Sequence, residues 1–347
     1  MFMVLVLHIL GAGGILSSTE PFSVQYITGW TLEVAAFCAV NCYGLISGYV
    51  GIRSTYKYTN IVLLWLQVAL YSVGGTLISY LINPDAVGKL RLINSLFPVY
   101  QDLFWYFSAY FGMYFFIPLM NRIILSMNRR QAKMICLSIV LFFSVFAFTK
   151  NGDPFVTKGG YSVIWLSLLY ILGACIREFD FLASIKTVNL IVGYALSVLI
   201  SVGWKLFMKA NVVPMISNFI PEDGLISYTA STILFCGVAL LLIFSRWKRI
   251  SSKMVKLISF VSPAAFGVYI IHMQEDVNRR LFGSGLFERF ANYSPPLMVV
   301  AVLLSALVLF VLLAAIDKVR LWVFQKLQLK QRLLKLENKW IGNLWNE

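Results

Sequence analysis

Apolar stretches about as long as a lipid bilayer is thick follow one another along almost the whole chain and constrain its fold more than any other feature. A helix needs about 20 apolar residues to cross about 30 Å of hydrocarbon, and within lipid the backbone must satisfy its own polar groups, which favours helices. Charged residues make up only 13% of the 347 positions, against about 25% in soluble proteins. The stretches lie at residues 1–17, 31–50, 60–82, 103–120, 133–149, 160–176, 188–206, 225–246, 257–273 and 296–316. The sequence therefore predicts an all-α polytopic membrane helix bundle of about ten transmembrane helices.

The distribution of Lys and Arg predicts how these helices are oriented. If the N-terminus is cytoplasmic, the inside segments and the tail hold 20 of the 29 basic residues, and the outside loops hold 9. Cytoplasmic loops of membrane proteins carry such an excess, so we expect both termini in the cytoplasm. The net charge of +14 is then mostly a topology signal, and the sequence predicts no nucleic-acid partner.

The chain divides into a transmembrane domain at residues 1–316 and a basic tail at residues 317–347. The apolar side chains of the tail fall on one helical face: Leu329, Leu333, Leu336 and Trp340. A basic helix of this kind lies against membrane lipids with its lysines toward anionic headgroups, and recognition of a partner protein is the alternative role. The first stretch, Met1–Leu16, makes about 24 Å of helix, which is short for a span, so we expect the native span to begin upstream.

Three ionisable side chains inside the predicted spans are the first candidates for chemistry, because such groups are costly in lipid and usually face the bundle interior. His8 lies in the first span and His272 ends the ninth. With an ordinary pKa of about 6.5, histidine suits proton transfer near neutral pH. Glu33, near the outer end of the second span, could orient or charge-stabilise His8. Alternatively, each histidine could bond a neighbouring helix, and Glu33 could extend to the membrane interface.

Metal and nucleotide-hydrolysis chemistry find no support in the sequence. Zinc-ligand spacing, a phosphate-binding glycine loop and a nucleophile elbow are all missing from it. The five cysteines lie in apolar stretches and lack the spacing of a metal site or of a disulfide framework. We therefore predict no metal site and interpret the cysteines as packing residues.

Five sequence blocks, in order from the first to the ninth predicted span, resemble the acyltransferase-3 family of integral membrane acyltransferases, which O-acetylate sugars and surface polysaccharides. The blocks are MVLVLH (3–8), CYGLISGYVG (42–51), WYFSAYFGMYFFIPLMN (105–121), GGYSVIWLSLLYILGACIRE (159–178) and SPAAFGVYIIH (262–272). Each block is mostly apolar, so the resemblance depends on the occurrence of all five in order.

The resemblance implies a reaction and its participants. The donor would be acetyl-CoA, a co-substrate on the cytoplasmic side, with no cofactor bound permanently. The acceptor would be a hydroxyl of a carbohydrate, either a surface polysaccharide or a lipid-linked sugar. His8 matches the family's first-helix histidine, which acts as catalytic base or acyl carrier, and Arg53 lies where the family places cations near the donor.

Further features of the family apply with one departure. The family typically has an arginine eleven residues before this histidine, a position that would precede Met1 here, in agreement with a start further upstream. Family habit also implies a multi-pass protein of a bacterial plasma membrane. The formation of a homo-oligomer stays open.

The physical chemistry of acyl transfer adds further candidates. A sugar hydroxyl is a poor nucleophile, so a base within hydrogen-bond reach is needed for its attack on a thioester, and the developing oxyanion needs donors. The hydroxyls of Ser47, Tyr49 and Tyr110 are candidate donors. We therefore group His8 with Glu33 as candidate catalytic residues. The candidate donor- or substrate-binding residues are Ser47, Tyr49, Arg53, Tyr110 and His272.

Two other classes of protein compete with this interpretation. A secondary transporter or polysaccharide flippase is also built from ten or more spans, often with inverted repeats, although no repeat is visible here. A structural or sensor protein is the third alternative. It predicts that both histidines can be replaced without consequence.

Overall fold

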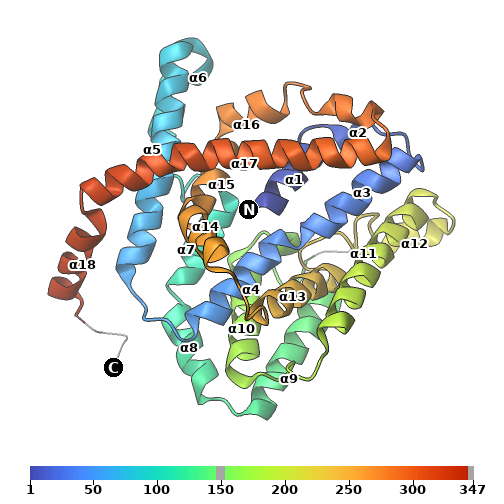
Figure 1. The fold of residues 1–347 in the computed structure, drawn as a ribbon, viewed down its shortest axis with the longest axis horizontal. Helices are drawn as coiled ribbons and strands as arrows, with labels where there is room; N and C mark the ends of the chain where they lie inside the picture. The colour runs from blue at the N-terminus through green and yellow to red at the C-terminus, as the bar shows by residue number, and fades with distance from the viewer. Residues whose placement is uncertain (146–152, 343–347) are drawn as a thin grey trace.

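The computed structural model describes residues 1–145 and 153–342, and within these ranges the chain is helical and contains no strand (Figure 1). An all-helical chain was expected from the composition, because the backbone N–H and C=O groups of an apolar segment in lipid find partners only within a helix or a closed barrel. The all-α class predicted from the sequence is therefore confirmed.

Five helical segments in the described residues are long and apolar enough to cross a membrane. They are Val24–Gly51, made of α3 (Val24–Phe37) and α4 (Ala39–Gly51); α5 (Tyr58–Ile82); α11 (Thr187–Lys209); Ser252–Met273, made of α14 (Ser252–Val261) and α15 (Ala265–Met273); and α17 (Pro295–Lys326). Shorter apolar segments are Phe2–Ser18, with α1 (Phe2–Leu10) and α2 (Ile15–Ser18), and α13 (Ser231–Ser245). The chain is thus a multi-pass membrane protein, while the number of ten spans and the sides of the termini stay predictions.

One predicted span is broken in the structure. The stretch 103–120 forms α7 (Trp105–Tyr114) and the start of α8 (Ile117–Ser126), and the two helices are bent by 57°. Pro118 lies at the beginning of α8, where its missing N–H costs no hydrogen bond but prevents α7 from continuing. If α7 and α8 together count as one span, the described residues contain six candidate membrane spans.

The remaining α-helices of the described chain are shorter or more polar. Their bounds are α6 (Pro84–Asn94), α9 (Arg129–Val140), α10 (Val163–Phe179), α12 (Pro214–Phe219), α16 (Glu275–Phe282) and α18 (Leu329–Trp340). The predicted stretch 133–149 begins in α9 and continues as a π-helical segment, Leu141–Val145, and its last residues lie outside the described ones.

The interior is organised around close contact between α4 and α10. A Cβ atom at Gly48 would lie 1.9 Å from the carbonyl oxygen of Tyr170, and a Cβ atom at Gly173 would lie 2.0 Å from the carbonyl oxygen of Leu45. Glycines on both helices therefore let the two backbones touch, as small residues do between membrane helices. This contact brings the inner face of α4, with Ser47, close to the other helices of the core.

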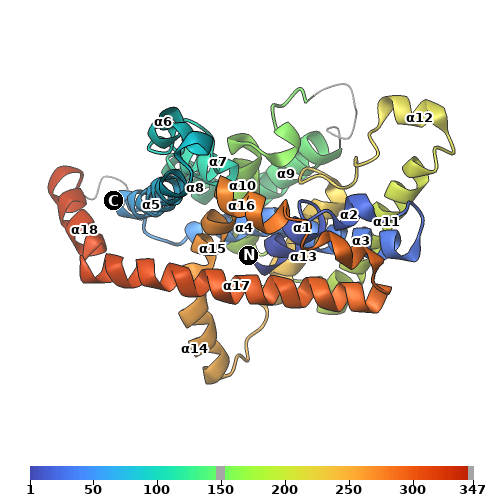
Figure 2. The ribbon, with the colours of Figure 1, turned by 90° about the horizontal axis from the view of Figure 1, so that it is seen from above.

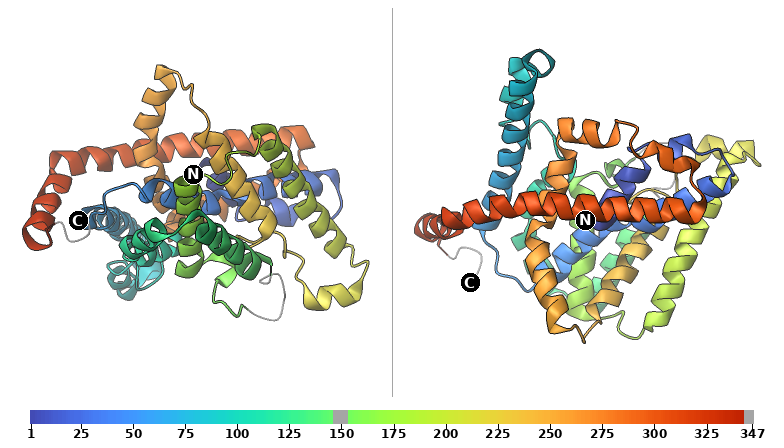
Figure 3. Two further views of the ribbon diagram at one scale, coloured as in Figure 1. Left: turned by 90° about the horizontal axis from the view of Figure 1, so that it is seen from below. Right: turned by 45° about the horizontal axis from the view of Figure 1, so that its top comes forward.

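The long helix α17 crosses the molecule along its longest dimension, with α18 at its far end (Figure 1). Against it pack α1, α3 and α15. The helix α14 projects from the body beside α17, and the α5–α6 arm projects from it as well (Figures 2 and 3). Thus α17 forms a common wall behind α1 and α15, the two helices that carry the histidines.

Candidate active site

The two histidines meet in the interior, although 264 positions separate them in the sequence. His8 lies in the last turn of α1 and His272 in the last turn of α15. The Nδ1 atom of His8 lies 2.8 Å from the Nε2 atom of His272, and His272 is completely buried. Each ring therefore limits the orientation of the other.

The backbone of α15 determines which nitrogen of each neutral ring carries a proton. The Nδ1 atom of His272 lies 2.6 Å from the carbonyl oxygen of Val268. A carbonyl oxygen only accepts, so Nδ1–H of His272 donates to it and Nε2 of His272 is left as an acceptor. The Nδ1 atom of His8 must then donate to that acceptor. When both rings are neutral, Nε2 of His8 is consequently unprotonated and basic.

His8 lines a cavity of about 280 Å³. Two further residues predicted from the sequence, Ser47 and Tyr110, line the same cavity. The rest of its wall is largely aromatic and comprises Tyr43, Trp105, Tyr106, Tyr228, Phe266 and Tyr269. Since pockets for whole ligands usually measure about 300–1,000 Å³, this cavity suits the reacting groups of a substrate better than a nucleotide-sized molecule.

Glu33 does not form the predicted contact with His8. It is buried on α3, and one of its oxygens, Oε2, has no hydrogen-bond partner among the described residues. The carboxylate of Glu33 interacts electrostatically with Tyr228, which lines the His8 cavity. The side chain that orients His8 in the structure is His272, and a catalytic role for Glu33 stays a prediction.

Three other candidates make contacts of a structural kind. The Ser47 hydroxyl donates to the carbonyl oxygen of Tyr43 at 2.8 Å, so its proton is not directed to the cavity. The Tyr49 hydroxyl accepts from Arg177 at 3.2 Å, and Tyr49 does not line the His8 cavity. Arg53 forms an ion pair with Glu178 at 2.7 Å and is also outside the cavity. Their functional roles stay predictions.

Tyr269 is a candidate functional residue that the sequence reasoning missed. It lines the cavity, and its ring centroid lies 6.0 Å from that of His272. Its hydroxyl is buried near the backbone of Tyr106 but forms no hydrogen bond of normal geometry with a described residue. Because a buried hydroxyl normally finds a partner, an unpaired one on a residue that lines the cavity makes Tyr269 a candidate hydrogen-bond donor. The three-residue spacing from His272, which places both side chains on one helical face, was the available signal.

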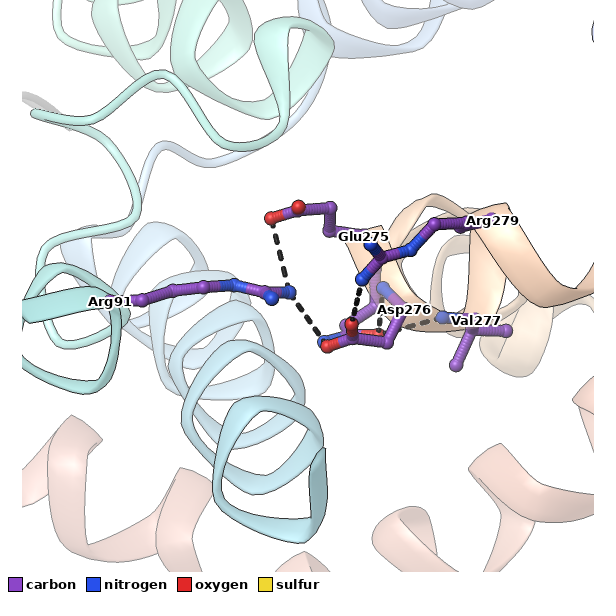
Figure 4. Close-up of polar contacts among 6 residues, drawn as sticks. Arg91, Glu275, Asp276, Val277 and Arg279 are labelled. Atoms are coloured by element: carbon purple, nitrogen blue, oxygen red, sulfur yellow. Dashed lines mark hydrogen bonds and ion pairs between the residues drawn. The ribbon is translucent and has the colours of Figure 1, made fainter. Parts of the chain in front are cut away.

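A cluster of ion pairs secures the chain just beyond His272 (Figure 4). The guanidinium of Arg91 in α6 lies between the carboxylates of Glu275 and Asp276, at 3.1 and 2.6 Å. Asp276 also pairs with Arg279 at 2.7 Å. In the same helix, Asn278 donates to the carbonyl oxygen of His272 at 3.2 Å. The cluster thus joins α6 to α16 and fixes the end of α15.

Burial raises the pKa of Asp276, but hydrogen bonds outweigh this effect and bring the pKa to about 2. The bonds come from Ser79, Arg279, Gln274 and Arg91. The carboxylate is therefore ionised at physiological pH and stabilises the fold there. Beside it lies a polar pocket of about 510 Å³, bounded on the His272 side by Met273 and Gln274.

The described residues contain no group of three or more His, Cys, Asp or Glu side chains that could hold a metal ion. The structure places a pair of histidines beside an aromatic cavity in a membrane helix bundle. The class that the fold and this site define is a membrane protein with a histidine pair at a cavity among its helices.

Comparison with known families agrees with this class. Residues 1–315 match the acyltransferase-3 family, described as an acyltransferase domain. The chain therefore belongs to the acyltransferase-3 family, which supports membrane acyltransferase activity. In comparisons with curated proteins and with solved structures, no match was found.

Proposed function

We propose that this protein transfers an acetyl group from acetyl-CoA to a hydroxyl group of a carbohydrate, a surface polysaccharide or a lipid-linked sugar, at a bacterial plasma membrane. One observation carries the proposal: the hydrogen bond from His8 to His272 leaves a basic nitrogen, His8 Nε2, on a residue that lines a cavity. The acyltransferase class itself is supported by the family match over residues 1–315.

The reaction exchanges one bond for another at the thioester carbon and moves one proton in two steps, through His8. His8 Nε2 takes the proton of the acceptor hydroxyl while the hydroxyl oxygen bonds to the thioester carbonyl carbon. The carbon–sulfur bond then breaks, and the proton passes from His8 to the departing coenzyme A thiolate. A positioned base contributes about 10²–10⁴-fold to such a step. In the competing route, Nε2 attacks the thioester carbon, the carbon–sulfur bond breaks and the coenzyme A thiolate leaves. The acceptor hydroxyl then attacks the acetyl group on His8, the carbon–nitrogen bond breaks, and the hydroxyl proton passes to the thiolate.

Each further residue has a role that follows from its position. His272 holds the His8 ring and fixes its tautomer, as the second member of a base–orienter pair. The Tyr269 hydroxyl donates to the developing oxyanion. The aromatic wall excludes water, which strengthens these interactions and prevents hydrolysis of the thioester.

The polar pocket of about 510 Å³ supports a carbohydrate acceptor. It lies next to the end of α15 and presents amide groups from Asn94, Gln101 and Asn278. The aromatic ring of Phe104 completes the lining, at 6.5 Å between ring centroids from Tyr269 of the His8 cavity. Amides accept and donate together, which suits the hydroxyl groups of a sugar.

The experiment that tests the proposal is acetyl transfer in membrane vesicles containing the protein. Vesicles receive acetyl-CoA labelled in the acetyl group, together with cell-envelope glycan. We expect label in the glycan that mild base releases, as it does for an O-acetyl ester. Label no higher than in vesicles without the protein, combined with movement of the unmodified glycan across the membrane, would contradict the proposal and favour a flippase.

A further inference from the structure

A second and larger cavity, which we call the tail pocket, lies where the C-terminal segment folds back on the bundle. Its volume is about 860 Å³, and its wall comes from α5, the start of α15, the end of α17 and α18. The part contributed by α17 and α18 lies at residues 318–331, beyond the family match at residues 1–315. The tail thus adds a cavity to the transmembrane domain.

The lining of the tail pocket combines three kinds of side chain. Its charged members are all cations, Lys318, Arg320 and Lys330, and no Asp or Glu is among the described lining residues. Amide groups come from Asn60, Gln67, Gln325, Gln328 and Gln331. Aromatic surface comes from Trp322 and Phe324. Cations suit phosphate groups, and aromatic rings offer a stacking surface for a purine base.

The three cations differ in how free they are to bind a ligand. Arg320 is nearly buried and is bound by Asp317 through two hydrogen bonds, at 3.0 and 2.5 Å. Lys318 donates to the carbonyl oxygen of Phe260. Lys330 is exposed and forms no ion pair or hydrogen bond with a described residue. Lys330 therefore has its full charge available to an anion.

A specific contact holds the tail in the position that forms this pocket. The carboxylate of Glu337 in α18 accepts from the backbone N–H groups of Tyr58 and Thr59, at 2.7 and 3.0 Å. It also accepts from the Thr59 hydroxyl at 2.5 Å. Glu337 thus caps the N-terminus of α5, where a negative charge is favoured. The α18 wall is therefore a fixed part of the fold.

The tail pocket and the His8 cavity share a partition. Leu64 of α5 and Phe266 of α15 line both cavities. Only these two side chains belong to both linings among the described residues. A ligand in the tail pocket that extends a narrow chain between them would reach the cavity of His8.

We propose that the tail pocket binds the phosphate-bearing nucleotide end of the acyl-CoA donor, with the thioester arm passing between Leu64 and Phe266 toward His8. This inference rests on the proposed function, because it assumes acetyl-CoA as the donor. Size supports the assignment: about 860 Å³ accommodates a nucleotide, whereas the His8 cavity of about 280 Å³ accommodates only the reacting end.

The test measures binding and needs no turnover. The full chain, in nanodiscs of zwitterionic phosphatidylcholine, is titrated calorimetrically with coenzyme A and with adenosine 3′,5′-bisphosphate, which lacks the arm. Lys330→Glu should lower the binding affinity for both ligands about tenfold, because it places a carboxylate next to their phosphate groups. Lys335→Glu, the same change on α18 outside the pocket, should leave both affinities within about twofold.

A second variant tests the partition. Leu64→Trp fills the space between the cavities. It should lower the affinity for coenzyme A at least about fivefold, while the affinity for the bisphosphate changes by less than about twofold. Equal effects of Lys330→Glu and Lys335→Glu, or no effect of Leu64→Trp on coenzyme A, would overturn the inference. Loss of coenzyme A binding in discs that contain phosphatidylglycerol would assign the pocket to a lipid headgroup instead.

The outcomes separate this inference from the proposed function. Coenzyme A binding with the expected pattern, but without acetyl transfer to glycan, would support the pocket and contradict the carbohydrate acyltransferase. Acetyl transfer with coenzyme A binding insensitive to Lys330→Glu would support the enzyme and contradict the pocket.

Discussion

The hydrogen bond of 2.8 Å between Nδ1 of His8 and Nε2 of His272 has a defined direction, because the carbonyl oxygen of Val268 occupies the remaining nitrogen of His272. Because of this direction, Nε2 of His8 is left unprotonated and can act as a base. Its basicity therefore depends on His272, a residue that does not line the cavity.

Replacement of His272 tests this positioning role. His272→Phe removes the acceptor for His8 Nδ1–H while keeping an aromatic ring, so we expect the kcat for acetyl transfer to fall about 10²-fold with little change in KM for acetyl-CoA. The double variant His8→Ala/His272→Phe should be no slower than His8→Ala alone, since residues that act as a unit are not additive. Additive losses in steady-state assays would argue that His272 is only a packing residue.

Removal of the Tyr269 hydroxyl tests the oxyanion donor. Tyr269→Phe should lower kcat about 10²-fold, because the donor acts on charge that develops in the transition state, and it should leave coenzyme A binding unchanged. Tyr293→Phe removes a hydroxyl from a residue that does not line the cavity and serves as the matched control. Equal rates for the two variants would contradict the role of Tyr269.

Gly48 provides a test of the packing between α4 and α10. A Cβ atom there would lie 1.9 Å from the carbonyl oxygen of Tyr170, so Gly48→Ala must separate the helices and should cost about 1–3 kcal/mol of stability. A Cβ atom at Gly74 in α5 meets no packing neighbour within 4 Å, so Gly74→Ala is the control and should cause no loss of stability. Thermal unfolding in detergent measures both, and equal midpoints would contradict the close contact.

The ion pairs of Asp276 predict a dependence of stability on pH. The pKa of this carboxyl is about 2 in the folded protein, below the value of about 3.9 for an unfolded aspartate. The stabilisation is therefore complete above about pH 5 and is lost as the pH falls from about 4 toward 2. Asp276→Asn should lower the unfolding temperature at pH 7 and have a smaller effect at pH 3. A difference that is constant over this range would contradict the assignment.

The fold was predictable at the level of class because the length and spacing of apolar stretches depend directly on the bilayer. The break between α7 and α8 was harder to predict from the sequence, although Pro118 is visible there as its cause. The pairing of His8 with His272 could not be predicted, since apolar patterns give no information on which of many spans are neighbours. Glu33 was chosen as the partner of His8 for its expected depth, but depth alone does not specify on which face of the neighbouring helix a side chain lies.

Other parts of the site depend on the tertiary arrangement. The tail was predicted to lie against lipid from its amphipathic pattern, whereas the contact of Glu337 with the N-terminus of α5 joins segments 278 and 279 positions apart. The aromatic wall was present in the sequence as Trp105 and Tyr106 and the residues near them. In a protein with 27 Phe and 17 Tyr residues, however, only the packing distinguishes a cavity wall from a surface that faces lipid.

The most direct test of the central claim is acetyl transfer by His8→Ala with and without added imidazole. The substitution removes the basic nitrogen and leaves space in the cavity that a free imidazole can fill. We predict that label from acetyl-CoA no longer enters the glycan with His8→Ala, and that imidazole restores part of the transfer at pH values where its neutral form predominates. Transfer by His8→Ala at the wild-type rate without imidazole would contradict the assignment of His8 as the reacting base.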